Sequence, residues 1–136
     1  MLTLNGKFAL GHSASGSFKN IEGTMVSVQG SAILNTVRLR VGTGTTAATV
    51  NDYAIETPDT SLSVSGDNYS KPSAYGDDYI GMVTATFQNT TDNDIVVSEL
   101  GLLGTTNYNV LIAREVINPV TIPANGGTKT FTISIG

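Results

Sequence analysis

The chain has 136 residues, a length typical of one domain, and its 40% hydrophobic residues suffice for a buried core. Only 13% of the residues are charged, the net charge is -4 and no basic run occurs, so neither nucleic acid nor an anionic membrane is expected as a partner. The absence of cysteine excludes disulfides, thiolate nucleophiles and cysteine-ligated zinc. No cofactor is expected.

The N-terminal region shows the least regular pattern, and residues 1–31 are predicted to form an arm with at most one short strand, around Met25–Val28. The small residues of GHSASGSF are typical of a linker. Such an arm either packs loosely on its own domain or reaches onto a neighbouring subunit, and the sequence favours neither. The only histidine, His12, lies in this arm, where an exposed polar role is expected rather than a catalytic one.

The apolar stretch at the N-terminus is too short for a secretory signal peptide and contains Lys7, so synthesis in the cytoplasm is expected. No run of about eighteen apolar residues occurs anywhere, so no membrane-spanning helix is expected.

Residues 32–136 are predicted to form the folded domain, which begins with a strand in AILNTVRLRVG. Alternation with period two places Val37, Leu39 and Val41 towards the core. The two arginines between them then face away, either into solvent or towards an acidic neighbour or a phosphate.

The glycine-rich GTGTT that follows lacks the Lys-Ser/Thr pair of a phosphate-binding P-loop, so a nucleotide site is not expected there. TVNDYAIETP is interpreted as a loop or a single helical turn. Tyr53 and Ile55 are expected to tuck under the sheet, and Pro58 to end the segment.

SLSVSG predicts a brief strand, and a tyrosine- and aspartate-rich insertion follows it. Loops of this composition are typical of surfaces that contact sugars or proteins, although an ordinary long hairpin loop explains them as well. The candidate contact residues of this loop are Asp67, Tyr69, Tyr75, Asp77, Asp78 and Tyr79.

The stretch Tyr79–Ser134 reads as four strands laid end to end: IGMVTATFQ, IVVSELGLL, VLIAREV and TKTFTISI. Short runs rich in Val, Ile, Thr and Phe, separated by Asn, Asp and Gly, predict an antiparallel sheet that the first half of the chain covers. In the last strand, alternation places Phe131 and Ile133 on one face, with Thr130 and Thr132 on the other.

Two charges interrupt the apolar strands on either side of GTTNYN. A symmetric loop predicts that Leu103 lies opposite Val110, Gly101 opposite Ile112 and Glu99 opposite Arg114. Either Glu99 and Arg114 both point to solvent, or they form a partly buried cross-strand ion pair that fixes the register. We favour the ion pair, because a slip of one residue would bury each charge alone.

Residues for catalysis are scarce. Two carboxylate pairs, Glu56 with Asp59 and Asp77 with Asp78, have the chemistry of a glycosidase. The chain has no tryptophan and its sequence indicates no aromatic-rich cleft, so we do not expect an enzyme.

Calcium is the one metal that the loops suggest, because Asp92 and Asp94 in TDND are hard oxygen ligands. The EF-hand pattern fails, since neither the required glycine nor the glutamate follows. Tight turns rich in Asn and Asp satisfy their own backbone without a metal, so no metal site is expected.

Three phrases together resemble the small β-rich virion structural proteins of tailed bacteriophages. They are LRVGTGTTAATVNDYAIETP (Leu39–Pro58), ATFQNTTDNDIVVSELGLLG (Ala85–Gly104) and LIAREVINPVTIPANGGTKTFTISI (Leu111–Ile135). The likeness covers about two-thirds of the chain and departs at Leu103, where the family phrase has an aromatic residue. The resemblance implies a non-enzymatic component of a virus particle, in the head, neck or tail.

The expected fold is an all-β antiparallel sandwich, with a jelly roll as one form of it, and an irregular N-terminal arm. The expected function is that of a virion structural protein, made in the host cytoplasm, that decorates the capsid or joins head or tail components in symmetric copies. Its partners would be other virion proteins and further copies of itself. A receptor- or carbohydrate-binding module of a tail fibre is the alternative.

Overall fold

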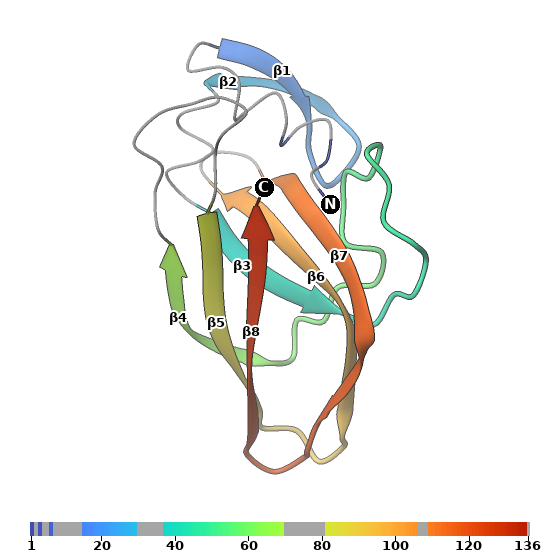
Figure 1. The fold of residues 1–136 in the computed structure, drawn as a ribbon, viewed down its shortest axis with the longest axis vertical. Helices are drawn as coiled ribbons and strands as arrows, with labels where there is room; N and C mark the ends of the chain where they lie inside the picture. The colour runs from blue at the N-terminus through green and yellow to red at the C-terminus, as the bar shows by residue number, and fades with distance from the viewer. Residues whose placement is uncertain are drawn as a thin grey trace.

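A computed structural model of the protein describes residues 1, 3, 6, 15–29, 37–69, 81–105 and 109–135. All eight elements within these residues are β-strands, and every pairing between them is antiparallel (Figure 1). The strands are β1 (Ser15–Lys19), β2 (Met25–Gln29), β3 (Val37–Gly42), β4 (Ser63–Tyr69), β5 (Gly81–Asn89), β6 (Ile95–Thr105), β7 (Asn109–Ile122) and β8 (Gly127–Ile135).

The strands form two three-stranded sheets, ordered β3-β6-β7 and β4-β5-β8, and a separate β1-β2 hairpin across one end of the molecule (Figure 1). All four strands of the C-terminal half are found at the expected places, but the expectation that they share one sheet is wrong. Each of the connections β5–β6 and β7–β8 crosses from one sheet to the other. Alternation tells which face of a strand is apolar but not which strand lies beside it.

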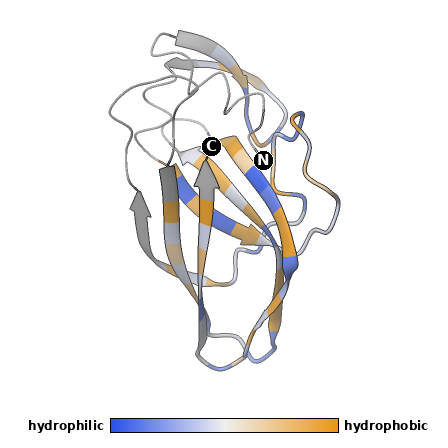
Figure 2. Ribbon diagram, in the orientation of Figure 1, coloured by the Kyte–Doolittle hydropathy of each residue, from blue (hydrophilic) through white to orange (hydrophobic). Residues whose placement is uncertain are grey.

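One apolar cluster joins the two sheets, with buried residues from β3, β5, β6, β7 and β8. Val37, Leu39 and Val41 are fully buried as predicted, and Figure 2 shows apolar and polar bands alternating along β3. Across the β5–β8 pair, the rings of Phe87 and Phe131 meet edge to face at 6.0 Å. Full burial of such side chains stabilises a fold by about 1.5–3 kcal/mol each. The sheets therefore stack in a sandwich-like arrangement, and the jelly roll stays a prediction.

The N-terminal region differs from the expected arm with at most one strand, because β1 and β2 are both strands. β1 also delivers Phe18 into the core, where it is fully buried. The turn between the strands is held by Asn20, whose side-chain oxygen accepts hydrogen bonds from the backbone N–H groups of Glu22 and Thr24. Among the hairpin residues whose burial is described, Phe18 is the one fully buried large apolar side chain, and a single such residue produces no visible period in the sequence.

The start of the chain pairs with the edge of β7. The α-ammonium of Met1 donates to the carbonyl of Arg114 at 3.0 Å, and the Arg114 N–H donates to the Met1 carbonyl at 3.0 Å. Thr3 is fully buried, and its hydroxyl donates to the Leu111 carbonyl at 2.6 Å. The described part of residues 1–31 thus packs on its own domain. Main-chain pairing of this kind needs no particular side chain, so it leaves no pattern in the sequence.

Candidate functional site

The β6–β7 hairpin has a different register from the predicted one. Leu103 lies opposite Leu111, Gly101 opposite Arg114 and Glu99 opposite Val116. The strands close with Thr105 opposite Asn109, which is one residue away from the symmetric register. The shift between Leu102 and Leu103 adds one more, so the offset at Gly101 and Glu99 is two residues. An offset of two keeps the side-chain faces unchanged, and Glu99 and Arg114 remain on the same face as diagonal neighbours.

The predicted ion pair is present and buried. The Nε of Arg114 donates to Oε2 of Glu99 at 2.8 Å, and the side chains are 3% and 0% exposed. The prediction of the pair is confirmed, although the register that motivated it is wrong. Such pairs stabilise a fold only when their remaining hydrogen-bonding groups are also satisfied, so the other contacts of the two side chains decide what the pair does.

Glu99 holds the segment between β3 and β4 against the sheet. Its Oε1 accepts hydrogen bonds from the backbone N–H groups of Gly44 at 3.0 Å and Thr57 at 2.7 Å, and its Oε2 accepts one from Glu56 at 3.0 Å. The neighbouring Ser98 hydroxyl donates to the Gly44 carbonyl at 2.9 Å. Both ends of the loop are therefore fixed to β6 by a single buried carboxylate and its neighbour.

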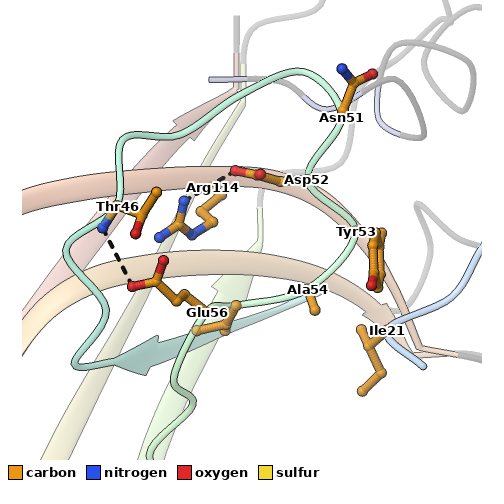
Figure 3. Close-up of a pocket in the computed structure, with 9 residues that line it drawn as sticks. Ile21, Thr46, Asn51, Asp52, Tyr53, Ala54, Glu56 and Arg114 are labelled. Atoms are coloured by element: carbon orange, nitrogen blue, oxygen red, sulfur yellow. Dashed lines mark hydrogen bonds and ion pairs between the residues drawn. The ribbon is translucent and has the colours of Figure 1, made fainter. Parts of the chain in front are cut away.

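Arg114 binds the middle of the same loop. Its Nη1 donates to Oδ2 of Asp52 at 3.1 Å (Figure 3), while its Nε is held by Glu99. Burial would lower the pKa of Arg114, but the two carboxylates outweigh this effect and raise it. Burial would likewise raise the pKa of Asp52, yet hydrogen bonds from Thr49 and Arg114 hold it below its usual value. The arginine therefore stays charged and the aspartate ionised.

Two glycines make this close approach feasible. A Cβ on Gly101 would lie 2.5 Å from Cγ1 of Ile55, and one on Gly44 would lie 2.6 Å from Oε1 of Glu99. Ile55 is buried as predicted, with its side chain lying against Gly101. Tyr53, however, is 40% exposed rather than tucked under the sheet. Its ring carries the Lys19 ammonium 4.9 Å from the centroid, which joins the loop to β1.

The glycine-rich GTGTT turns its N–H groups towards the protein's own carboxylates. Besides the Gly44 bond to Glu99, the N–H groups of Thr45 and Thr46 point at Oε1 of Glu56, at 3.1 and 3.4 Å. Hydrogen bonds from Thr46 are the main reason why the pKa of Glu56 lies below its usual value. A phosphate would have to displace these carboxylates.

A pocket of about 360 Å³ opens between this loop, β7 and the turn at Ile21. Its apolar wall is made of Ile21, Ala54 and Ile55, beside the ring of Tyr53. Its polar lining includes Asp52, Glu56 and Arg114, which Figure 3 shows with the guanidinium lying between the two carboxylates. Through this pocket the hydrogen-bonded set of Glu99, Arg114 and Asp52 reaches the protein surface.

The other predicted sites do not come together here. The strand predicted from SLSVSG continues to Tyr69 through a register shift between Ser65 and Asn68, so Asp67 and Tyr69 belong to β4 rather than to a loop. Uniform small polar residues hide such a bulge in the sequence. Tyr75, Asp77, Asp78 and Tyr79 lie outside the described residues, as does His12.

Two further described carboxylates, those of Asp59 and Asp94, stabilise turns. Asp59 accepts from the N–H and hydroxyl of Ser61, both at 2.8 Å, while Glu56 accepts from the N–H of Thr45. Oδ1 of Asp94 accepts from the Ala124 N–H at 2.9 Å. Nowhere in the described ranges do three His, Asp or Glu side chains gather in a way that would hold a metal ion.

The sequence did not indicate Asp52, Gly44 or Thr57 as parts of the cluster. One signal was available, because the three phrases that carry the resemblance each contribute to it. Leu39–Pro58 supplies Asp52 and the bonded N–H groups, while the other two phrases supply Glu99 and Arg114.

Comparison with protein-family models, with curated proteins and with solved structures finds no match for this chain. Among the described residues, no helix has the length and apolar character needed to cross a membrane.

Proposed function

We propose that this chain is a non-enzymatic structural protein of a tailed-bacteriophage virion, which decorates the capsid or joins head or tail components in symmetric copies. The observation that carries the proposal is the meeting of the three phage-like phrases in one buried cluster. Glu99 receives hydrogen bonds from Arg114 and from three backbone N–H groups of the loop. The three phrases thus together supply the residues that hold the β3–β4 loop in place, as expected of a protein whose role depends on a fixed structure.

The polar groups of the cluster argue for this role over catalysis. A catalytic carboxylate keeps an oxygen available to substrate, whereas both oxygens of Glu99 are used and its side chain is fully buried. The loop carboxylates Glu56 and Asp59 each accept hydrogen bonds from nearby backbone. The low content of charged residues, 13%, suits a surface that is covered by neighbouring subunits.

Location in a particle is the direct test. Antibody raised against the purified chain should label purified virions of the source at regularly repeated positions, because structural proteins occur in symmetric copies. Mass spectrometry of virions purified to constant composition should detect the chain in a stoichiometric amount. Its absence from such particles would overturn the proposal. Labelling confined to fibre tips, with binding to the host surface, would instead support the tail-fibre alternative.

Self-association gives a second readout. A specific subunit contact buries at least about 1,000 Å² in total, so sedimentation velocity should reveal oligomers, or complexes with a partner virion protein. A monomer at high concentration that binds no virion protein would count against an assembly role.

A further inference from the structure

Arg114 lines the pocket beside Asp52 and Glu56, and one donor of its guanidinium is used by nothing in the described part of the chain. Arg114 is 2% exposed, with Nε bonded to Glu99 and Nη1 to Asp52. Its Nη2 is buried and has no acceptor. Buried donors in proteins are nearly always paired, so Nη2 marks a position where an oxygen acceptor belongs.

The charges around the pocket decide what kind of oxygen this is. Two carboxylates, Asp52 and Glu56, line the pocket with one cation, Arg114, and the buried carboxylate of Glu99 is paired with that same cation. An incoming carboxylate or phosphate would meet an excess of negative charge and is disfavoured. A neutral carbonyl oxygen avoids this repulsion and still accepts from Nη2.

Glu56 adds a second requirement. Its Oε1 is occupied by the N–H groups of Thr45 and Thr46, while its carboxylate borders the pocket close to the guanidinium (Figure 3). A ligand that donates an N–H to the second oxygen of Glu56, while accepting from Arg114, would satisfy both groups. A primary amide carries a carbonyl oxygen and an NH₂ side by side, so it matches this pair.

We propose that this pocket binds the side-chain amide of an asparagine or glutamine carried on an extended segment of a neighbouring protein subunit. The methylene groups of that side chain would lie along Ile21, Ala54 and Ile55, which form the apolar wall. Because Nη2 is covered, binding requires a small movement of a side chain at the pocket, with Glu56 held in place by the N–H groups of Thr45 and Thr46. The choice of a neighbouring subunit as the carrier rests on the proposed assembly role, whereas the preference for an amide rests on the chemistry of the pocket alone.

The test uses capped tripeptides that differ in one group. The ¹⁵N-labelled full chain is titrated with acetyl-Gly-Gln-Gly-N-methylamide, whose only primary amide is the glutamine side chain, and with its isosteric glutamate counterpart. A leucine peptide with the same caps controls for apolar contact. We expect the glutamine peptide to shift the Nε–H signal of Arg114 and the amides of Thr46 and Ala54 in a saturable way. The glutamate peptide should bind at least tenfold more weakly.

Two matched substitutions locate the effect. Glu56→Gln replaces the second carboxylate oxygen with an NH₂ group and removes one negative charge. It should therefore weaken binding of the glutamine peptide severalfold and reduce the discrimination against the glutamate peptide. Glu115→Gln makes the same chemical change at an exposed position of β7 and should leave both titrations as in the unmodified chain. Absence of shifts with the glutamine peptide, equal shifts with all three peptides, or equal behaviour of the two variants would overturn the proposal.

Discussion

Two regions of this protein solve the same problem with different side chains. Asn89, at the end of β5, and Glu99, in β6, are both fully buried polar residues that tie an irregular segment to the sheets. The amide of Asn89 donates to the carbonyls of Asn93 at 2.8 Å and Ile122 at 2.9 Å. Its oxygen accepts from the N–H and the hydroxyl of Thr91, at 3.0 and 2.6 Å.

The two regions differ in reach and in charge. Asn89 is neutral and finds most of its partners within four residues along the chain. Glu99 is a carboxylate whose loop partners lie 42 to 55 residues away, and it needs Arg114 as a counter-ion. We call a buried polar side chain together with its hydrogen-bond partners a hub, so that Asn89 forms the neutral hub and Glu99 with Arg114 the charged hub. Burying a neutral hub costs little free energy once it is hydrogen-bonded, whereas a charged hub is stable only when all its partners are present. The comparison teaches that the attachment of the distant loop depends on every member of the Glu99–Arg114 set, so one substitution there should destabilise the fold more than one at Asn89.

The largest effect is expected for Arg114→Ala, which leaves Glu99 charged and buried without its counter-ion. Removing one partner of a buried pair costs about 3–5 kcal/mol of unfolding free energy, measured by urea denaturation. The double variant Glu99→Gln with Arg114→Gln should lose less than the sum of the two single variants. Lys129→Ala removes an exposed charge and should change stability by less than about 0.5 kcal/mol. Small, additive effects would show that the charged hub is not essential.

Next in size is Asn89→Ala, which strips the local hub. It leaves the Ile122 carbonyl buried without this partner, which costs about 1–3 kcal/mol, whereas the partly exposed Thr91 N–H regains a bond to water and adds little. Asn93→Ala, an exposed position in the same turn, is the control and should be nearly neutral. If Asn89→Ala destabilised as much as Arg114→Ala in the same urea series, the contrast between the two hubs would fail.

Asp52→Asn tests the contribution of Asp52, at the outer part of the charged hub, through the pH dependence of stability. The pKa of Asp52 is lowered from 3.8, so its ionised form stabilises the folded state above that value, and this contribution is lost as the pH falls through the folded pKa. Unfolding curves of the unmodified chain should therefore fall more steeply below about pH 4 than those of the variant. At pH 7 the loss should be about 1 kcal/mol or less, since Asp52 is partly exposed. Parallel pH curves would contradict a stabilising role for Asp52.

The smallest effect is expected on the exposed face of the β5–β8 pair. Thr86 and Thr130 share a hydrogen bond of 2.8 Å between their hydroxyls, as Thr84 and Thr132 do at 3.0 Å. Thr86→Ala should cost about 0.2–1 kcal/mol in thermal or urea unfolding, because cross-strand pairs in solvent contribute little. A larger cost would indicate that this face is covered, and it would remove the baseline against which both hubs are judged.

Much of the fold could be predicted because β-strands carry their own signal. The faces of β3 and β8 follow from alternation alone, and the buried Val37 and Phe131 and the outward Thr130 are where this period places them. The turn after Asn89 is predictable for a similar reason, since its amide bonds to residues that follow it directly. The pairing of Glu99 with Arg114 could be inferred because two charges in apolar strands need each other.

The candidate site was harder to predict because its hydrogen bonds are made to backbone. Any residue other than proline offers an N–H group, so the loop positions that bind Glu99 carry no required side chain. Asp52 looked like an ordinary turn residue, which it also is, through its bond to Thr49. The outward position of Tyr53 depended on Lys19 from a hairpin whose two strands the sequence did not reveal together.

The sequence by itself determined the class of fold, the apolar face of each main strand and the need for a Glu99–Arg114 pair. Only the tertiary structure decided which strands share a sheet, that the pair is diagonal, and which loop it holds. The physical reason is that side-chain alternation encodes only a choice between two faces. The choice of neighbour is made by bulges, glycine contacts and backbone hydrogen bonds between residues far apart in the chain.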